Sequence, residues 1–184
     1  MHEASQQDDG WPWQPRLEGA RLLLRPLVEA DVEPLAAAAA DPAIWALHPE
    51  PDRWQRPIFE RFFRSGIDSR GALLVLERAT GAVLGSSRFT RHDPAARSVE
   101  IGYTFLVTRC WGTGLNRELK GLMLAHAFRH VDRVEFVVGE RNLRSRRAME
   151  KLGGVPLREE EKTTWRGARV RSVVYGIERA AWRG

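Results

Sequence analysis

The sequence predicts a mixed α/β (α+β) fold in which a mixed, mostly antiparallel sheet of about seven strands is flanked by four helices. Along the chain, the hydrophobic residues change from helical spacing to strict alternation and back, so helices and strands are interleaved. Two connections are short glycine turns typical of hairpins, which argues against a doubly wound parallel sheet. A length of 184 residues with 43% hydrophobic and 29% charged residues suits one globular domain.

The N-terminal part predicts a tail, a strand and two helices. Residues 1–15 form the tail, and Trp11 and Trp13 are placed to clamp it onto a single domain at 16–184. The expected elements are a strand at 20–27, a helix at 31–40 capped by Asp31, and a helix at 52–64 with aromatic residues at helical spacing.

The middle of the chain predicts three strands. Ala72–Arg78 and Val83–Arg91 flank Thr80-Gly81, a hairpin signal. In the third strand the alternation is regular over Ser98–Val107. The apolar face carries Val99, Ile101, Tyr103, Phe105 and Val107, and the polar face carries Ser98, Glu100, Gly102 and Thr104.

The C-terminal half alternates helices with strands, again by hydrophobic period and by glycine or asparagine at the helix ends. The expected elements are a helix from Gly112 or Thr113 to about His130, a strand at 134–138, a helix from Asn142 to Leu152, and strands near 155–163 and 168–177.

Composition favours an anionic partner and excludes several classes of protein. The formal charge is +5, and only three of the 29 basic residues are lysines. Arginine suits phosphate because its guanidinium forms paired hydrogen bonds, although so general an excess also fits a compositional bias. A single cysteine excludes a disulfide framework and a multi-cysteine metal site. The acidic N-terminus is unlike a secretory signal and no segment suits a membrane span, so a cytoplasmic protein is expected.

The segment after the third predicted strand is the most informative one. Arg109, Gly112 and Gly114 lie in a turn between a strand and a helix. Glycines allow a ligand to approach the backbone closely, and free amides at a helix start attract phosphate. The turn matches neither the Walker A spacing nor the dinucleotide fingerprint. Such turns also serve packing alone, so phosphate binding and a structural role both stay open.

A second group of candidate site residues lies on the helix that begins at Asn142. By the 3.6-residue period, Ser145 shares one stripe with Ala148, Met149 and Leu152. Its hydroxyl is therefore expected to point inward, either toward a site or back to a carbonyl one turn earlier.

Together these motifs resemble the GNAT superfamily of N-acetyltransferases, and most nearly its ribosomal-protein-alanine acetyltransferase-like branch. The resemblance rests on Arg109-x-x-Gly112-x-Gly114, on Asn142-x-x-Ser145 and on Leu152-Gly153, in the family's order and spacing. It covers nearly everything after about Leu17. It implies a splayed pair of parallel strands, at 98–107 and 134–138, that admits acetyl-CoA.

The resemblance also implies roles for the cofactor-binding residues. The pantetheine arm would pair with the backbone of Leu106 and Val107, one of whose amides would polarise the thioester carbonyl. Asn142 would hydrogen-bond the pantetheine, cap its helix, or do both. Arg147 or Lys151 would meet the 3′-phosphate. The pyrophosphate would lie on the turn and on the first residues of the next helix, namely Arg109, Trp111, Gly112, Thr113, Gly114, Leu115 and Asn116.

For catalysis, the resemblance implies direct attack of an amine on the thioester. Glu100 is the expected base, through a water, with an exposed strand glutamate as the alternative. Ser145 is expected near the sulfur, as an acid or only as a group that orients the cofactor. Cys110 is expected to be a small apolar filler. His126 and His130 lie one turn apart without a third ligand, so no metal is expected.

The expected function is acetyl transfer from acetyl-CoA to a primary amine: a peptide N-terminus, an amino acid or a small amine. One alternative is a CoA-binding protein without catalysis. Another is a basic nucleic-acid-binding module, which the 24 interleaved acidic residues and the lack of a nucleic-acid motif argue against. A monomer or a homodimer is expected.

Overall fold

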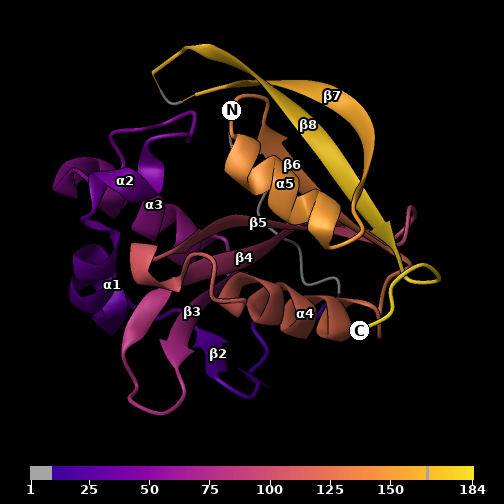
Figure 1. The fold of residues 1–184 in the computed structure, drawn as a ribbon, viewed down its shortest axis with the longest axis horizontal. Helices are drawn as coiled ribbons and strands as arrows, with labels where there is room; N and C mark the ends of the chain where they lie inside the picture. Colours follow the sequence, from indigo (N-terminus) through magenta and orange to yellow (C-terminus); the bar gives the residue numbers. More distant parts are fainter. Residues whose placement is uncertain (1–9, 165) are drawn as a thin grey trace.

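A single twisted sheet runs through the molecule, with helices on both of its faces (Figure 1). The computed structural model describes residues 10–164 and 166–184. Within them the sheet has eight strands in the order β1-β2-β3-β4-β5-β6-β8-β7. The strands are β1 (Leu17–Glu18), β2 (Leu22–Pro26), β3 (Ala72–Glu77), β4 (Val83–Asp93), β5 (Ser98–Leu106), β6 (Arg133–Gly139), β7 (Val155–Thr163) and β8 (Arg169–Glu178).

All neighbouring strands are antiparallel except β5 and β6. The predicted mixed, mostly antiparallel sheet is therefore confirmed, with one short edge strand more than expected. That strand, β1, forms because the chain turns back at Gly19, whose amide donates to the Leu22 carbonyl at 2.8 Å. Two residues are too few for the alternation of a strand to show in the sequence.

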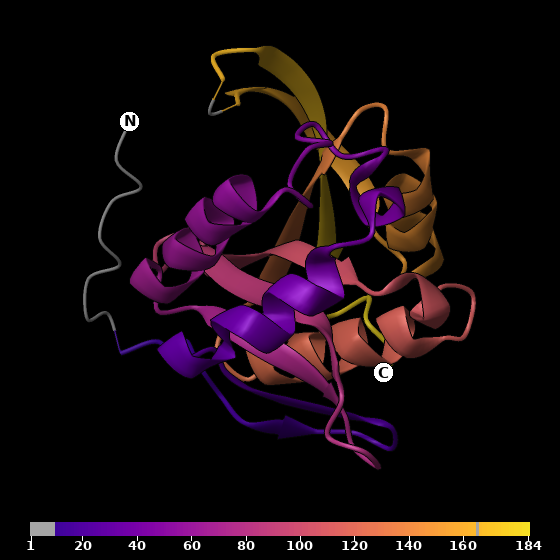
Figure 2. The ribbon, with the colours of Figure 1, turned by 90° about the vertical axis from the view of Figure 1, so that its left-hand side faces the viewer.

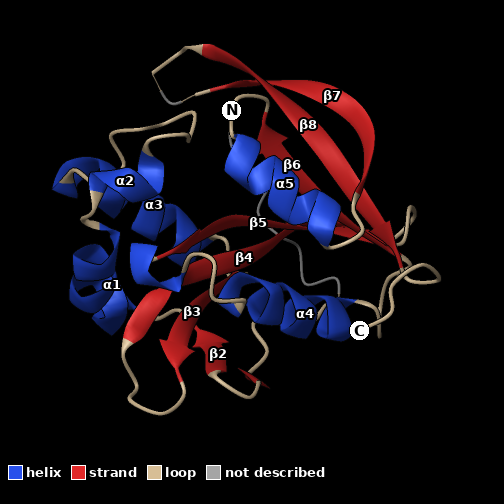
Figure 3. Cartoon of the chain, in the orientation of Figure 1, coloured by secondary structure: helices blue, strands red, loops and turns tan. Residues whose placement is uncertain are grey.

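The helices are α1 (Val32–Ala39), α2 (Pro42–Trp45), α3 (Arg56–Asp68), α4 (Leu115–Ala127) and α5 (Leu143–Lys151) (Figure 3). The expected helix at 52–64 begins four residues late and ends four residues late. Its start is set by Pro57 in the first turn, after an extended Gln55. The four-residue helix α2 lies in what was expected to be a loop. No helix of the described part is long and apolar enough to cross a membrane.

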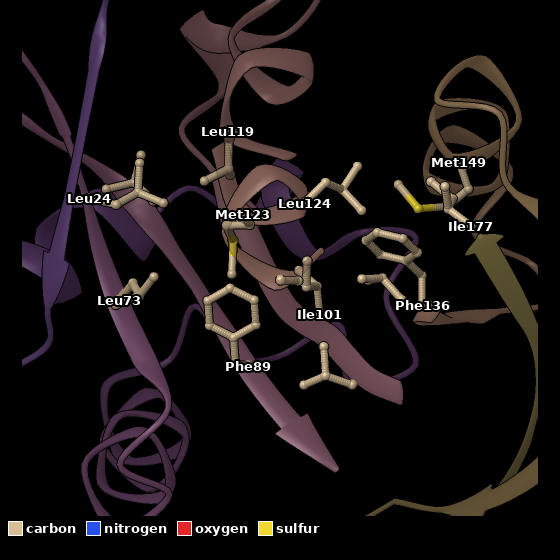
Figure 4. Packing of buried hydrophobic residues seen from close by; sticks show 14 of the residues in the cluster. Leu24, Leu73, Phe89, Ile101, Leu119, Met123, Leu124, Phe136, Met149 and Ile177 are labelled. Atoms are coloured by element: carbon tan, nitrogen blue, oxygen red, sulfur yellow. The ribbon is translucent and has the colours of Figure 1, made fainter. Parts of the chain in front are cut away.

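Two hydrophobic cores lie on the opposite faces of the sheet. The α4-side core joins α4 and α5 to the sheet, and Leu24, Phe89, Ile101, Met123 and Phe136 are among its members (Figure 4). The α3-side core joins α1 and α3 to the other face. It includes Leu35, Trp45, Phe59, Leu74 and Phe105. Figure 2, turned by 90°, shows α1 and α3 at the front of the sheet.

The end of the expected tail is packed against the body. Trp11 is 6% exposed and belongs to the α4-side core. Its ring lies 4.7 Å from that of His92 and 5.3 Å from that of His130, between centroids. The rest of the expected tail, residues 1–9, lies outside the described residues.

Candidate active site

The parallel strands β5 and β6 separate soon after they meet. They pair over Ser98–Glu100 with Arg133–Glu135, and among the described residues no further pairing joins them. Past Glu100, β5 pairs on its other side with β4. One edge of β5 is thus left open, and an open strand edge can receive an extended ligand as an added strand.

A cleft of about 320 Å³ lies where the two strands part. It is lined from both faces of the sheet and from the loop between α2 and α3. Of the predicted site residues, it brings together Glu100, Asn116, Asn142 and Ser145. Other lining residues include His48, Glu50, Arg53, Thr104, Lys120, Phe136 and Lys162.

A β-bulge in β5 changes which side chains face the cleft. Gly102 pairs with Arg88 and Phe105 pairs with Ser86, so Tyr103 and Thr104 together oppose one residue of β4. Tyr103 has φ +53°, a left-handed conformation. Because the bulge inserts one residue, the side chains that follow it change faces of the sheet. The prediction that one apolar face continues along the whole strand is therefore wrong beyond Ile101. Phe105 lies in the α3-side core rather than with Ile101.

Glu100 is 5% exposed and points into the cleft. Its Oε2 forms an ion pair with Arg91 at 3.4 Å. A Cβ built on Gly102 would lie 2.8 Å from Oε1, so the glycine makes room for the carboxylate. Burial raises the pKa of Glu100 above its usual range, against the opposing effect of Lys162 and Arg91. A buried carboxylate with a raised pKa is the state that a proton acceptor needs.

The start of α5 combines a cap and a cleft wall. Asn142 is 8% exposed, and its Oδ1 accepts a hydrogen bond from the Ser145 amide at 3.1 Å. Asn142 is therefore the predicted N-cap, and the Nδ2 donor is not used by the cap. Ser145, Ala148 and Met149 line the cleft and Leu152 packs against the α4-side core, so the four predicted residues face inward. Arg147 is exposed on α5.

The turn before α4 is held by its own contacts. Gly112 and Gly114 have φ +74° and +84°, a region that favours glycine. The Thr113 hydroxyl donates to the Cys110 carbonyl at 2.7 Å. Arg109 reaches Glu77 at 3.4 Å. This turn, together with Leu115, does not line the cleft itself but leads directly into Asn116, which does.

One acidic residue missed by the sequence analysis fixes α4 in place. Glu118 Oε1 accepts from the amides of Arg21 and Leu22, at 2.7 and 3.0 Å. These bonds hold the first turn of the helix against the start of β2. Cys110, by contrast, is 2% exposed within the α4-side core, as expected of a filler.

The structure separates the two backbone positions expected to hold the pantetheine. The Val107 amide donates to the Leu84 carbonyl at 2.8 Å, so β4 already uses it and the expectation is wrong for this amide. The backbone amide of Leu106 points in the opposite direction by strand alternation, toward the open edge of β5. Its carbonyl accepts the Trp111 indole N–H at 3.2 Å.

Besides Lys162, three further cations near the cleft were not predicted. Lys120 lines it from α4, one turn after Asn116, a spacing from which its place was readable. Arg53 is 7% exposed and lies over the Trp45 ring at 5.3 Å from the centroid. Arg144 lies 3.8 Å from the Trp111 ring centroid, beside the turn.

Comparison with known proteins agrees with this geometry. The acetyltransferase (GNAT) domain model matches residues 21–155. A crystal structure described as an acetyltransferase has 28% identity and a TM-score of 0.81, covering 94% of this chain and 90% of that one. An acetyltransferase structure from T. thermophilus has 28% identity and a TM-score of 0.73, covering 94% and 93%.

A more distant neighbour, at 16% identity, is a spermidine N-acetyltransferase from Vibrio cholerae in complex with CoA and spermine. Its TM-score is 0.67, over 89% of this chain and 98% of that one. No curated protein sequence matches the chain significantly. The family match spans most of the chain, so this protein belongs to the GNAT family of acetyltransferases. It is an enzyme that transfers acetyl groups.

Proposed function

We propose that this enzyme transfers the acetyl group of acetyl-CoA directly to a primary amine. The single observation that carries the proposal is the opening of β5 and β6 at Glu100, a buried carboxylate with a raised pKa in a cleft between two strand edges. When bound, acetyl-CoA supplies an acetyl group activated as a thioester.

The residues present fit that cosubstrate. The open edge of β5 at Leu106 suits the extended pantetheine arm. The glycines of the turn carry no side chain over the start of α4, and nothing lies within 4 Å of a Cβ built on Gly112. The amides of Leu115 and Asn116 then offer a helix N-terminus to phosphate. We assign the remaining contacts to Arg109, Trp111, Thr113, Gly114, Asn142 and Arg147.

The catalytic roles follow from where the side chains lie. Glu100 accepts the proton of the acceptor ammonium through a water. The Ser145 hydroxyl orients the cofactor from the α5 wall. Direct transfer needs no covalent nucleophile, in keeping with the burial of Cys110 outside the cleft lining.

The acceptor is the less constrained substrate. The cleft wall carries Glu50 and Arg53 from the α2–α3 loop, Glu100 from β5 and Lys162 from β7. This mixture of charges suits a singly charged amine with polar neighbours, such as a peptide N-terminus. Together with the resemblance to the ribosomal-protein-alanine branch, it makes a peptide the first acceptor to test. We propose action in the cytoplasm as a monomer or a homodimer.

A thermal-shift titration with acetyl-CoA is the first test. Specific binding raises the melting temperature, so no shift at millimolar ligand contradicts the proposal. Gly112→Trp should abolish the shift, because a bulky residue at positive φ fills the approach to the turn.

Thiol release then tests catalysis. The panel contains a tripeptide with N-terminal alanine, free alanine and spermidine. Release with one of them supports transfer, whereas binding without release indicates a CoA-binding protein without catalysis. Glu100→Gln should lower kcat by ~10²-fold or more and leave the acetyl-CoA shift unchanged. Full activity of Glu100→Gln across the pH range would show that Glu100 is not the base.

A further inference from the structure

Lys120 is a buried amine inside the cleft. It is 3% exposed and lines the cleft beside Asn116. Its Nζ donates to the Thr104 hydroxyl at 2.6 Å, and that hydroxyl lies 2.7 Å from the Ser87 hydroxyl. The bulge makes the contact possible, because it turns Thr104 to the α4 side of the sheet.

The charges around Lys120 leave it without a counter-ion. Within 10–164 and 166–184 no carboxylate forms an ion pair with Nζ, which lies 5.4 Å from the centroid of the Phe136 ring. Burial lowers the pKa of Lys120 to about 7, and only Glu100 opposes this shift. The other titratable groups of the cleft wall are His48, Glu50 and Arg53 from the α2–α3 loop, Tyr103 from β5 and Lys162 from β7.

A buried ammonium that has a hydrogen bond but no counter-ion destabilises a fold, so its place needs an explanation. Among the described residues no ion pair joins Lys120 to Glu100, whose Oε2 pairs with Arg91, so Glu100 acts on Lys120 only from a greater distance. An anion that forms in the cleft during the reaction would be a suitable counter-ion for Lys120. Acetyl transfer produces one such anion, the thiolate of CoA.

We propose that Lys120 is the proton donor to the sulfur of CoA, a catalytic role that rests on the function proposed above. In the step, the nitrogen of the acceptor amine forms a bond to the acetyl carbonyl carbon and the carbon–sulfur bond breaks. The electron pair of that bond stays on sulfur, which takes the proton from Lys120 Nζ. The proton that the amine loses goes through water to Glu100. The products are the acetylated amine and CoA with a free thiol, and solvent protons restore Lys120.

The pKa values of Lys120, the CoA thiol and the acceptor ammonium decide whether Lys120 acts as an acid or as a base. An ordinary thiol has a pKa of about 8.5 and an alkylammonium about 10.4. A lysine whose pKa is about 7 therefore gives its proton to a thiolate downhill, but takes one from an ammonium uphill. Ser145, the hydroxyl first expected near the sulfur, is a far weaker acid, so the lysine is the better donor.

The first test needs no acceptor and no turnover. CoA is bound to the wild-type protein, to Lys120→Met and to the control Arg117→Met, and its thiol is titrated by thiolate absorbance. Arg117 is exposed on the same helix, so the control removes a cation that does not face the cleft. An ammonium beside the sulfur favours the thiolate. Because Lys120 carries this charge only below its own pKa of about 7, thiolate absorbance is expected to begin at lower pH in the wild type and control than in Lys120→Met, which should titrate like free CoA.

Equal thiol pKa values in the wild type and Lys120→Met would overturn the role of Lys120 while leaving the proposed function in place. Failure of CoA to bind the wild type would overturn both. Circular dichroism of Lys120→Met shows whether the variant is folded. If it is not, Lys120→Gln, which keeps a donor for Thr104, replaces it in the titration.

The pH profile of kcat is the second test, with the best acceptor of the tripeptide, alanine and spermidine panel. An acid must be protonated, so the wild-type kcat falls as pH rises through the pKa of Lys120. Lys120→Met is expected to lose ~10²-fold in kcat and to keep its KM for acetyl-CoA. Its kcat should not show this fall with rising pH, the alkaline limb of the profile. An unchanged limb contradicts the proposal. So does mass spectrometry that finds an acetyl group on Lys120 itself, since the lysine would then be an acceptor.

Discussion

At the scale of single residues, the side chains that line the cleft depend on open space beside them as well as on hydrogen bonds and ion pairs. The carboxylate of Glu100 lies over Gly102, which has no side chain there. The Oδ1 of Asn142 accepts the hydrogen bond that caps α5, and its Nδ2 takes no part in the cap. His48 is held neutral by its surroundings. Each arrangement can be changed by one small substitution, and each change has a different readout.

Gly102→Ala should misplace the carboxylate of Glu100. The added methyl would lie 2.8 Å from Oε1, which is too close, while the backbone at this position accepts alanine. We expect a lower kcat with little change in acetyl-CoA binding, measured by thiol release and thermal shift. Gly121→Ala on α4 is the control, because nothing lies within 4 Å of its Cβ. Equal kcat values for the two variants would contradict the positioning role.

His48 should make stability depend on pH. Burial, followed by the charge of Arg53, lowers its pKa to about 3. The unfolded chain binds a proton near pH 6.5 and the folded chain does not, so stability is full above pH 6.5 and falls as pH drops toward 3. The slope is at most about 1.4 kcal/mol per pH unit. In His48→Asn, the melting temperature should depend less on pH between about 6.5 and 4; parallel curves would refute this.

At the scale of elements, the positions of helix starts and of one bulge decide the site. Asn142 marks where α5 begins and was readable as a cap, whereas α4 begins at Leu115 after Gly114, later than the predicted start at Gly112 or Thr113. The bulge in β5 was not readable. Gly102-Tyr103 continues the alternation in sequence, and only the register with β4 shows the extra residue.

The same contrast explains how much of the site was predictable. Glu100 and Ser145 were placed in the cleft by their own strand and helix periods, which are local properties. Lys120 follows Asn116 by one helical turn, so its place was readable as well, whereas Arg53 depends on packing between distant segments. Arg53 lies in a turn that the helical pattern of 52–64 concealed, and its place between aromatic rings depends on Trp45 and Phe62. Tertiary contacts of this kind have no period in the sequence.

The cap of α5 can be separated from ligand binding by a pair of variants. Asn142→Asp keeps an oxygen acceptor for the Ser145 amide but loses the Nδ2 donor, whereas Asn142→Ala loses both. We expect Asn142→Ala to lower the free energy of unfolding by about 1 kcal/mol and Asn142→Asp to change it little. Both should weaken acetyl-CoA binding by thermal shift. Tight binding by Asn142→Asp would leave Asn142 with the cap role alone.

At the scale of the whole molecule, the excess of arginine is used mainly on the surface. Arg56 bridges Glu33 and Glu60, and Arg158 pairs with Glu135 and Glu160. Exposed pairs of this kind contribute about 0–1 kcal/mol each. Stability therefore rests on the two cores, and the basic charge is a poor guide to the partner.

The α4-side core also ties the N-terminal segment to the rest of the chain through Trp11. Trp11→Ala should lower the free energy of unfolding by about 3 kcal/mol or more, because a large buried ring leaves a cavity. Urea denaturation measures the loss. Trp54→Ala is the control, since Trp54 is 41% exposed. If both variants lose the same free energy, Trp11 does not anchor this segment.

The short pairing of β5 with β6 has a consequence for the motions of the sheet. Antiparallel ladders run from β1 to β5 on one side and from β6 to β7 on the other, but in the described part of the chain the ladder between β5 and β6 consists of only three residue pairs. A seam of three residue pairs opens locally at lower free energy than the long ladders beside it. Amide hydrogens at Arg133–Glu135 should therefore exchange with solvent sooner than those in the middle of β8. A molecule that bridges the two strand edges would slow this exchange without touching those amides.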